Sequence, residues 1–277
     1  MVKFTADDKI YIKILYWGMA RSGKTTILDT LYRHTKEDEQ DIAPTGNLTK
    51  ISLASGSTLY FDRGIFSSTK QKSREKLFYH VYTVAGQRRF SPLRNKIFKG
   101  TDGVIFTVDS QTRFFQDNIE SLKELKNIAK GKLIKEIPLI IMLNKQDLTE
   151  VIGKEDFKQV LIEENLWYDP DNEFSMWNPA IYKTCALYNQ RKNIYRSFLE
   201  CARRINLNRD FDGNGSYLHP HIFKPPTPSE DLALGGHPQA REPINKKDPE
   251  YEPYCKHCGA ELPKRQSICH VCGKKIL

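Results

Sequence analysis

The sequence lacks any long apolar run. Its longest, from 137 to 143, falls far short of the ~20 residues that a helix needs to cross a bilayer. The first residues, MVKFTADDK, contain no apolar core of a secretion signal. Neither end carries a lipidation signal, since the chain begins Met-Val and Cys272 is not fourth from the end. We therefore expect a cytoplasmic globular protein without a transmembrane segment, in which peripheral membrane contact would depend on charge or on a partner.

One segment has too few acidic residues to balance its bases. The chain holds 43 basic and 34 acidic residues, a net charge of +9. The segment Arg63–Lys99 alone holds ten basic residues against one acid, Glu75, and so accounts for the whole excess. A basic cluster of this kind fits a nucleic acid, an anionic membrane or an acidic protein surface, and equally a solvated face. Charge alone therefore leaves the class of partner open.

Cysteine is scarce before the last 23 residues, where four of the six cysteines gather. These four are Cys255, Cys258, Cys269 and Cys272, and they form two CxxC pairs separated by ten residues. Each pair is followed by a glycine. In a chain without an export signal, such pairs indicate metal ligands rather than disulfides. Four thiolates suit tetrahedral Zn²⁺, and the pattern resembles the two knuckles of a zinc ribbon. Because a fold of ~25 residues has too little core to stand without metal, we expect the zinc ion to be structural.

From Lys9 onward, short β-rich runs alternate with helical patterns, which indicates an α/β fold with about six mostly parallel strands and helices on both faces. The predicted strands are Ile10–Trp17, Ile51–Phe61 with a turn at 55–57, Leu77–Val84, Gly103–Asp109, Ile137–Leu143 and Ala180–Thr184. The predicted helices are Lys24–His34, Pro92–Phe98, Asp117–Lys130, Lys154–Asn165 and Gln190–Ile205. These elements predict one domain over 1–206, a linker rich in proline and glycine over 207–253, and the zinc ribbon over 254–277.

The first predicted strand leads directly into Gly18–Thr25, which fits the GxxxxGK[ST] pattern of a phosphate-binding loop. This chemistry needs small residues, because backbone N–H groups must converge on the phosphates at the positive end of the following helix. Lys24 would bridge the β- and γ-phosphates, and Thr25 would bind Mg²⁺. The expected nucleotide contacts from this loop are Gly18, Ala20, Arg21, Ser22, Gly23, Lys24, Thr25 and Thr26.

A second pattern, NKQD at 144–147, directly follows an apolar strand. The carboxylate of Asp147 can accept the ring N–H and the exocyclic amine of guanine, whereas adenine would leave the charge unpaired, so GTP and GDP are expected. Lys145 would pack along the base, and a backbone amide of residues 185–186 would meet the guanine carbonyl. The expected contacts with the base are Asn144, Lys145, Asp147, Cys185 and Ala186. Asp109, at the end of the fourth strand, is interpreted as a helix cap.

These motifs resemble those of the small GTPases of the Ras superfamily, and more closely those of the MglA group of bacterial and archaeal polarity GTPases. The likeness runs from Lys3 to Leu166 and is densest in SLASGSTLYFD, LFYHVYTVAGQ, GTDGVIFTVDSQ and NKQDL. The resemblance implies a P-loop small GTPase fold in which Gly86 senses the γ-phosphate and Gln87 orients the attacking water. Ordinary small GTPases carry Asp-x-x-Gly-Gln where this chain has TVAGQ from Thr83, although the MglA group also has Thr here. The missing Asp would normally hold a magnesium-bound water.

The first switch of such a GTPase needs a threonine that binds Mg²⁺ and contacts the γ-phosphate. Thr58 in STLYFD aligns with the motif of the MglA group, whereas Thr45 in APTG resembles that of Arf-type switches, and Thr58 is the preferred interpretation. The implied catalytic residues are Gln87, Lys24 and Thr58, and the implied Mg²⁺ ligands are Thr25 and Thr58. In the MglA group an intrinsic arginine finger precedes this threonine, but here the residue is Ser57. The candidate replacements are Arg63, Arg21, Arg88 and Arg89.

The sequence thus predicts a small GTPase switch that slowly hydrolyses GTP to GDP and depends on a GTPase-activating partner. By resemblance that partner is a roadblock-fold protein, while effectors would bind the switch regions and the zinc ribbon. One alternative is a GTP-binding scaffold without turnover, because Ser57 and Thr83 depart from the usual patterns. A second is a nucleic-acid-associated zinc-ribbon factor, which the absence of an aromatic or arginine face in the ribbon disfavours.

Overall fold

The computed structural model describes residues 3–4, 9–38, 40–52, 58–69, 76–87, 90–187 and 191–210. Helices cover both faces of a single mixed sheet, as the alternation of strand and helix patterns predicts. The predicted linker over 207–253 reaches beyond these residues, and the predicted zinc ribbon over 254–277, with its four cysteines, lies wholly outside them. The domain boundaries and the zinc site therefore remain predictions.

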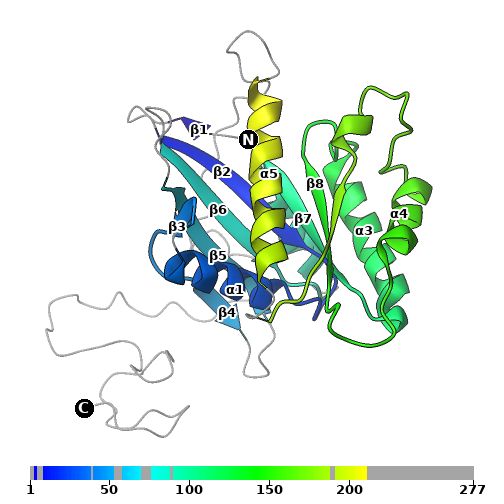
Figure 1. Cartoon of the computed structure of the whole chain (residues 1–277), viewed down its shortest axis with the longest axis horizontal. Helices are drawn as coiled ribbons and strands as arrows, with labels where there is room; N and C mark the ends of the chain where they lie inside the picture. Colours follow the sequence, from blue (N-terminus) through cyan, green and yellow to red (C-terminus); the bar gives the residue numbers. More distant parts are fainter. Residues whose placement is uncertain are drawn as a thin grey trace, which may run out of the picture. The chain divides into compact units, whose positions relative to one another are not determined.

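The described residues form a sheet of nine strands, seven of which follow the order β3-β5-β6-β2-β7-β8-β9 (Figure 1). The strands are β1 Lys3–Phe4, β2 Lys9–Trp17, β3 Ile42–Pro44, β4 Thr49–Ser52, β5 Thr58–Ser68, β6 Lys76–Val84, β7 Gly103–Asp109, β8 Leu139–Asn144 and β9 Ala180–Lys183. β6, β2, β7, β8 and β9 are parallel to one another. β5 pairs antiparallel with β3, β4 and β6, and β1 pairs antiparallel with β2.

Two groups of helices enclose the sheet. The helices are α1 Lys24–Glu37, α2 Ser91–Phe98, α3 Phe115–Ala129, α4 Lys154–Glu163 and α5 Lys192–Asp210, with short 3₁₀ turns η2 Thr112–Phe114 and η3 Ser175–Trp177. α1 and α5 pack together on one face, drawn in blue and yellow in Figure 1, and α2, α3 and α4 cover the other. Side chains alternate along β2, so that Leu15 and Trp17 enter one core and Ile14 and Tyr16 the other. Among the described helices, none is long and apolar enough to span a membrane.

The helix predictions are confirmed, because each predicted helix is present with bounds that differ by a few residues. The predicted strand Ile51–Phe61 is wrong in extent: β4 ends at Ser52, β5 continues to Ser68, and the expected turn at 55–57 lies outside the described residues. The sequence pattern did not reveal the later part of β5, because this part contains Gly64 and glycine has a low strand propensity. Pairing with β6 nevertheless keeps Gly64 in the sheet.

The sheet is larger than the six strands predicted, since β1, β3 and the separate β4 are added. β1 and β3 are too short to give a period-two pattern, which explains why the sequence did not reveal them. β3 ends in Pro44 and lies at the edge of the sheet, where a residue without an N–H group is tolerated. The added strands all lie on the β5 side or beside β2, away from β8 and β9.

Candidate functional site

The candidate site lies at the carboxyl edge of the parallel strands. β2 ends at Trp17 and β8 at Asn144, and each is followed by one of the two loops with a predicted nucleotide-binding motif; β7, which ends at Asp109, lies between them. In open α/β sheets this edge is where ligands bind, because the loops after parallel strands meet there. The fold therefore collects motifs that are widely separated in the chain.

The loop from Gly18 to Gly23 has the unusual backbone that its glycine pattern predicts. The φ angle is 149° at Gly18, 64° at Arg21 and 97° at Gly23. A Cβ atom at Gly23 would lie 2.3 Å from Asn144 Nδ2, so a larger residue has no room. Asn144 is fully buried, and its Nδ2 donates to the Ser22 carbonyl at 2.8 Å. The NKQD loop thus holds the phosphate loop in place.

Lys24 begins α1 and turns its side chain back over the loop. Its Nζ donates to the carbonyls of Gly18 (2.9 Å) and Met19 (2.6 Å), and it lies 3.3 Å from Ser22 Oγ. Burial lowers the pKa of Lys24 to about 7; the nearby Arg94 cation lowers it as well, while Asp62 acts in the opposite direction. An anion bound in the loop would therefore stabilise the charged ammonium that burial disfavours.

Asp62 on β5 joins this site, although no motif in the sequence pointed to it. Thr25 Oγ1 donates to Asp62 Oδ2 at 2.5 Å, and Thr83 Oγ1 donates to the same oxygen at 2.9 Å. The side chain is almost fully buried, with 1% of its surface exposed. Asp62 and Thr83 are direct cross-strand partners in the β5–β6 ladder. A neighbouring strand thus supplies the carboxylate that the TVAGQ motif lacks.

Among the candidate replacements for the arginine finger, Arg63 lies on the wrong face of β5. Side chains alternate along a strand, so Arg63 points away from the face that carries Asp62. Its guanidinium lies 5.7 Å from the centre of the Tyr82 ring. Arg21 remains exposed in the phosphate loop. The other two candidates, Arg88 and Arg89, and the substituted position Ser57 lie outside the described residues.

The two candidate switch threonines both lie near β5. Thr58 is its first residue, and no contact of its side chain is described. Thr45 donates its backbone N–H to the Ile65 carbonyl at 2.8 Å, and its exposed hydroxyl lies 3.3 Å from the same oxygen. The choice of Thr58 therefore stays a prediction.

Gly86 and Gln87 follow the end of β6, and Gly86 lies against the phosphate loop. A Cβ atom at Gly86 would fall 2.2 Å from the Ala20 nitrogen and 2.3 Å from the Met19 carbonyl carbon, so only glycine fits there. Gln87 is half-buried, and its carbonyl accepts the N–H of Phe90 at 3.0 Å. Gly86, the residue predicted to sense the γ-phosphate, is thus brought beside the loop that would hold the phosphates, and Gln87, predicted to position water, is the next residue in the chain.

Asp109 is not the helix cap that the sequence suggested. The residue that caps α3 is Phe114, which makes no side-chain cap bond. Asp109 is instead fully buried, and its Oδ2 accepts a hydrogen bond from Lys145 Nζ at 2.6 Å, while Oδ1 accepts the N–H of Gln111 at 3.2 Å. This ion pair holds the side chain of Lys145 in place. Lys145 has a left-handed backbone (φ 66°) and belongs to the NKQD segment at 144–147, which we call the base loop. The interpretation of Asp109 as a cap is wrong because Asp109 pairs with Lys145, which directly follows the end of β8.

The loop after β9 completes the base side of the site. Gln146 N–H donates to the Thr184 carbonyl at 3.1 Å, and Thr30 Oγ1 donates to the Ala186 carbonyl at 2.6 Å. Burial raises the pKa of the Cys185 thiol; the Leu187 N–H opposes this, and a hydrogen bond with Asp147 adds to it. The structure thus places Asp147 beside Cys185 and Ala186, and Asp147 is exposed to solvent.

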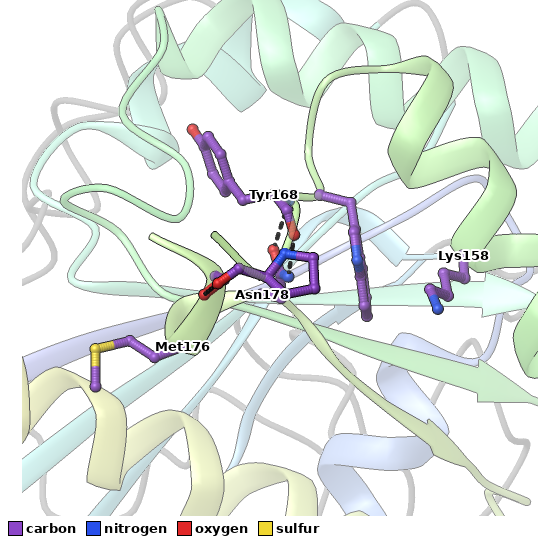
Figure 2. Close-up of a pocket in the computed structure, with 7 residues that line it drawn as sticks. Lys158, Tyr168, Met176 and Asn178 are labelled. Carbon is purple, nitrogen blue, oxygen red and sulfur yellow. Dashed lines mark hydrogen bonds between the residues drawn. The ribbon is translucent and has the colours of Figure 1, made fainter. Parts of the chain in front are cut away.

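A surface hollow of about 410 Å³ lies elsewhere, beside α4, where Lys158, Tyr168, Met176 and Asn178 line it (Figure 2). Asn178 accepts the Tyr168 N–H at 2.7 Å and donates to the Tyr168 carbonyl at 2.8 Å, which closes the segment between them into a loop. The lining includes no residue of the phosphate loop or the base loop. We therefore assign the chemistry to the carboxyl edge of the sheet and not to this hollow.

Comparison with known proteins covers the part of the chain that carries this site. The family model of the ADP-ribosylation factor family matches residues 1–198. The mutual gliding-motility protein MglA of Myxococcus xanthus (strain DK1622) is 35% identical over 163 residues, which cover 58% of this chain and 80% of that protein. ADP-ribosylation factor-like protein 3 of Caenorhabditis elegans is 30% identical over 152 residues, 54% of this chain and 69% of that protein. ADP-ribosylation factor-like protein 6 of the same organism is 25% identical over 180 residues, 64% and 78% respectively.

Proposed function

Because the chain belongs to the ADP-ribosylation factor family of small GTPases, within the Ras superfamily, we propose that it is a switch that binds GTP and slowly hydrolyses it to GDP and phosphate. The observation that carries this proposal is the cluster of Thr25, Asp62 and Thr83 beside the phosphate loop, where a carboxylate is available despite the TVAGQ motif. Switching would follow because the γ-phosphate orders two loops and its loss releases them.

The same cluster fits a magnesium ion. Mg²⁺ prefers oxygen ligands and is usually held by one or two protein groups together with phosphate oxygens and water. Thr25 Oγ1 and Asp62 Oδ2 offer such oxygens 2.5 Å apart at a buried position, and Thr58 begins the strand that carries Asp62. Bound there, the ion would neutralise charge on the β- and γ-phosphates. We propose Thr25, Asp62 and Thr58 as the residues that hold it, directly or through water.

The other site residues take roles that their contacts support. Lys24 Nζ would exchange the carbonyls of its own loop for phosphate oxygens, which would favour its charged form. Backbone N–H groups of the loop would surround the phosphates at the start of α1. Gln87 would orient the attacking water, and Asp147 would accept the two N–H donors of guanine.

We propose that the switch depends on partners. Ser57, and not an arginine, directly precedes Thr58, so intrinsic hydrolysis would be slow and a GTPase-activating protein would accelerate it. The likeness to the MglA group favours a roadblock-fold protein in that role, with effectors at the switch regions and the zinc ribbon, in the cytoplasm. The alternative of a scaffold without turnover rests on the departures at Ser57 and Thr83. The carboxylate of Asp62 beside Thr83 weakens the argument from Thr83. The alternative of a nucleic-acid factor gains no support from the described residues.

The Asp147→Asn variant tests whether the substrate is a guanine nucleotide. In the native protein with Mg²⁺, we expect phosphate release from GTP and none from ATP. The ratio of GTP affinity to xanthosine triphosphate affinity should be at least tenfold smaller in the variant than in the native protein, because a charged hydrogen bond contributes roughly 1.5 to 3 kcal/mol. Nucleotide affinities and phosphate release measured for the three triphosphates check this.

Asp171→Asn is the matched control, because Asp171 is an exposed acid on the segment between α4 and β9. It should leave the preference unchanged. Equal affinity of the native protein for ATP and GTP would contradict the proposed function.

We propose that Cys255, Cys258, Cys269 and Cys272 bind one zinc ion that folds the ribbon and takes no part in hydrolysis. The proline- and glycine-rich segment between 207 and 253 would separate the ribbon from the GTPase domain. Deleting residues 250–277 should abolish stoichiometric zinc while GTP turnover stays within about twofold. Metal analysis and phosphate release on the same preparations check this. Retained zinc, or loss of nucleotide binding together with the metal, would contradict an independent module.

A further inference from the structure

Arg94 on α2 makes an unusual set of contacts around the residues that follow β6. Its side chain is buried, with 4% of its surface exposed. Nη1 donates to the Ala85 carbonyl at 2.9 Å and to the Gln87 carbonyl at 2.9 Å. These two carbonyls flank Gly86, the residue that touches the phosphate loop. One guanidinium nitrogen therefore holds the backbone on both sides of the proposed phosphate sensor.

The rest of the guanidinium is fixed by α3. Nε and Nη2 both donate to Glu124 Oε1, at 3.0 Å and 2.6 Å. The same oxygen accepts Ser91 Oγ at 2.6 Å, so the start of α2 is bound as well. The guanidinium also lies 5.7 Å from the centre of the Trp17 ring at the end of β2. Its position is thus set by α3 and the sheet, and the loop at 85–87 is held against that fixed point.

We propose that Arg94 is a positioning residue for hydrolysis, which holds the backbone at Ala85 and Gln87 so that the Gln87 side chain meets the attacking water. This inference rests on the proposed function. Arg94 would touch neither nucleotide nor water. Its positive charge also acts on Lys24, and Arg94→Lys keeps that charge, so this variant isolates the contacts with the backbone at Ala85 and Gln87. The physical reason is geometric: a planar fork with several fixed donors sets the position of two carbonyls, whereas a misplacement of about 1 Å at a reacting group can cost up to 10²-fold in rate.

If Arg94 served only to hold α2 against α3, its hydrogen bonds would not need to reach the loop at 85–87. α2 and α3 already pack through Ile97, Phe98 and Leu122 in one apolar core. A buried cation adds to such packing only when its donors are matched, and here two of the hydrogen bonds go to loop carbonyls outside any helix. Substitution should therefore affect the loop more than the core.

The test compares single-turnover hydrolysis of bound GTP in Arg94→Gln, Arg94→Lys and native protein. We expect both variants to hydrolyse GTP about tenfold more slowly, with GDP affinity within about threefold of native. Arg203→Gln is the matched control, because Arg203 pairs with Glu200 on the exposed side of α5. It should keep the native rate. Full activity of Arg94→Lys would overturn the proposal, since a lysine supplies the charge without the fork.

A second comparison removes Gln87. In a Gln87→Leu background, Arg94→Lys should cause no further loss, because the residue through which the fork acts is absent and the charge beside Lys24 is kept. An equal loss in both backgrounds would show a general structural defect and would overturn the proposal. If the native protein bound no GTP, the proposed function itself would fail. A Gln87-dependent reaction that Arg94→Gln leaves unchanged would overturn only the role of Arg94.

Discussion

Replacing Asp62 by asparagine should weaken Mg²⁺ binding in the GTP complex by about 100-fold, because removing one partner of a buried charged interaction costs roughly 2 to 5 kcal/mol. Asparagine keeps the shape of the side chain and can still accept a hydrogen bond from Thr25 and Thr83. The variant therefore changes the charge at the site more than its packing. Titration of nucleotide release against Mg²⁺ concentration measures the effect.

The exchange variant Asp62→Thr with Thr83→Asp provides the sharper comparison. It moves the carboxylate to the cross-strand partner and keeps the composition of the pair. We expect it to recover most of the Mg²⁺ affinity that Asp62→Asn loses, because the charge stays beside Thr25. Asp171→Asn should have no effect, since Asp171 is exposed on the segment before β9. Native Mg²⁺ affinity in Asp62→Asn would show that the metal does not use this carboxylate.

Replacing Ser57 by arginine should raise the basal rate of GTP hydrolysis by up to ~10³-fold, since an arginine finger contributes 10³ to 10⁵ in rate. The position directly precedes Thr58, where the resemblance to the MglA group places an intrinsic finger. The native protein, with a short hydroxyl side chain there, should remain slow until a partner supplies the missing cation. Phosphate release without any partner protein measures the difference.

Two controls accompany Ser57→Arg. Ser57→Lys should give a smaller increase, because an ammonium lacks the planar fork that binds the phosphate oxygens in two places. Ser57→Arg combined with Gln87→Leu should return to a slow rate, because the water is no longer oriented. A native protein that already turns over quickly alone, or an unchanged rate in Ser57→Arg, would refute this account.

The sequence predicted those parts of the site that each lie within one short segment of the chain. The phosphate loop needs glycine at fixed positions for its backbone, and the NKQD segment carries its own carboxylate, so both could be recognised locally. Asp62 could not, because its role depends on the register between β5 and β6, which places it opposite Thr83. Alternation along a strand shows which residues share a face, but not which residue on the next strand they meet.

The same distinction explains the errors. Asp109 was assigned a local role as a cap, whereas its partner Lys145 lies at the end of the neighbouring strand. The end of β5 was misplaced because Gly64 has a weak strand propensity and only its pairing with β6 keeps it extended. α3, α4 and α5 gave reliable signals, since the three- and four-residue spacing of their apolar residues repeats over several turns.

The hydrogen bonds that close the site have a consequence for folding. Asn144 and Ser22 are 122 positions apart, and Thr30 and Ala186 are 156 apart. We expect such contacts to form late in folding, because the entropy of closing long loops must be lost before they contribute. A growing chain on the ribosome would have the phosphate loop long before the base loop, and a nucleotide could bind tightly only to the finished sheet. By mass action, bound nucleotide would then protect the folded protein, and the empty form would be the one most exposed to proteolysis.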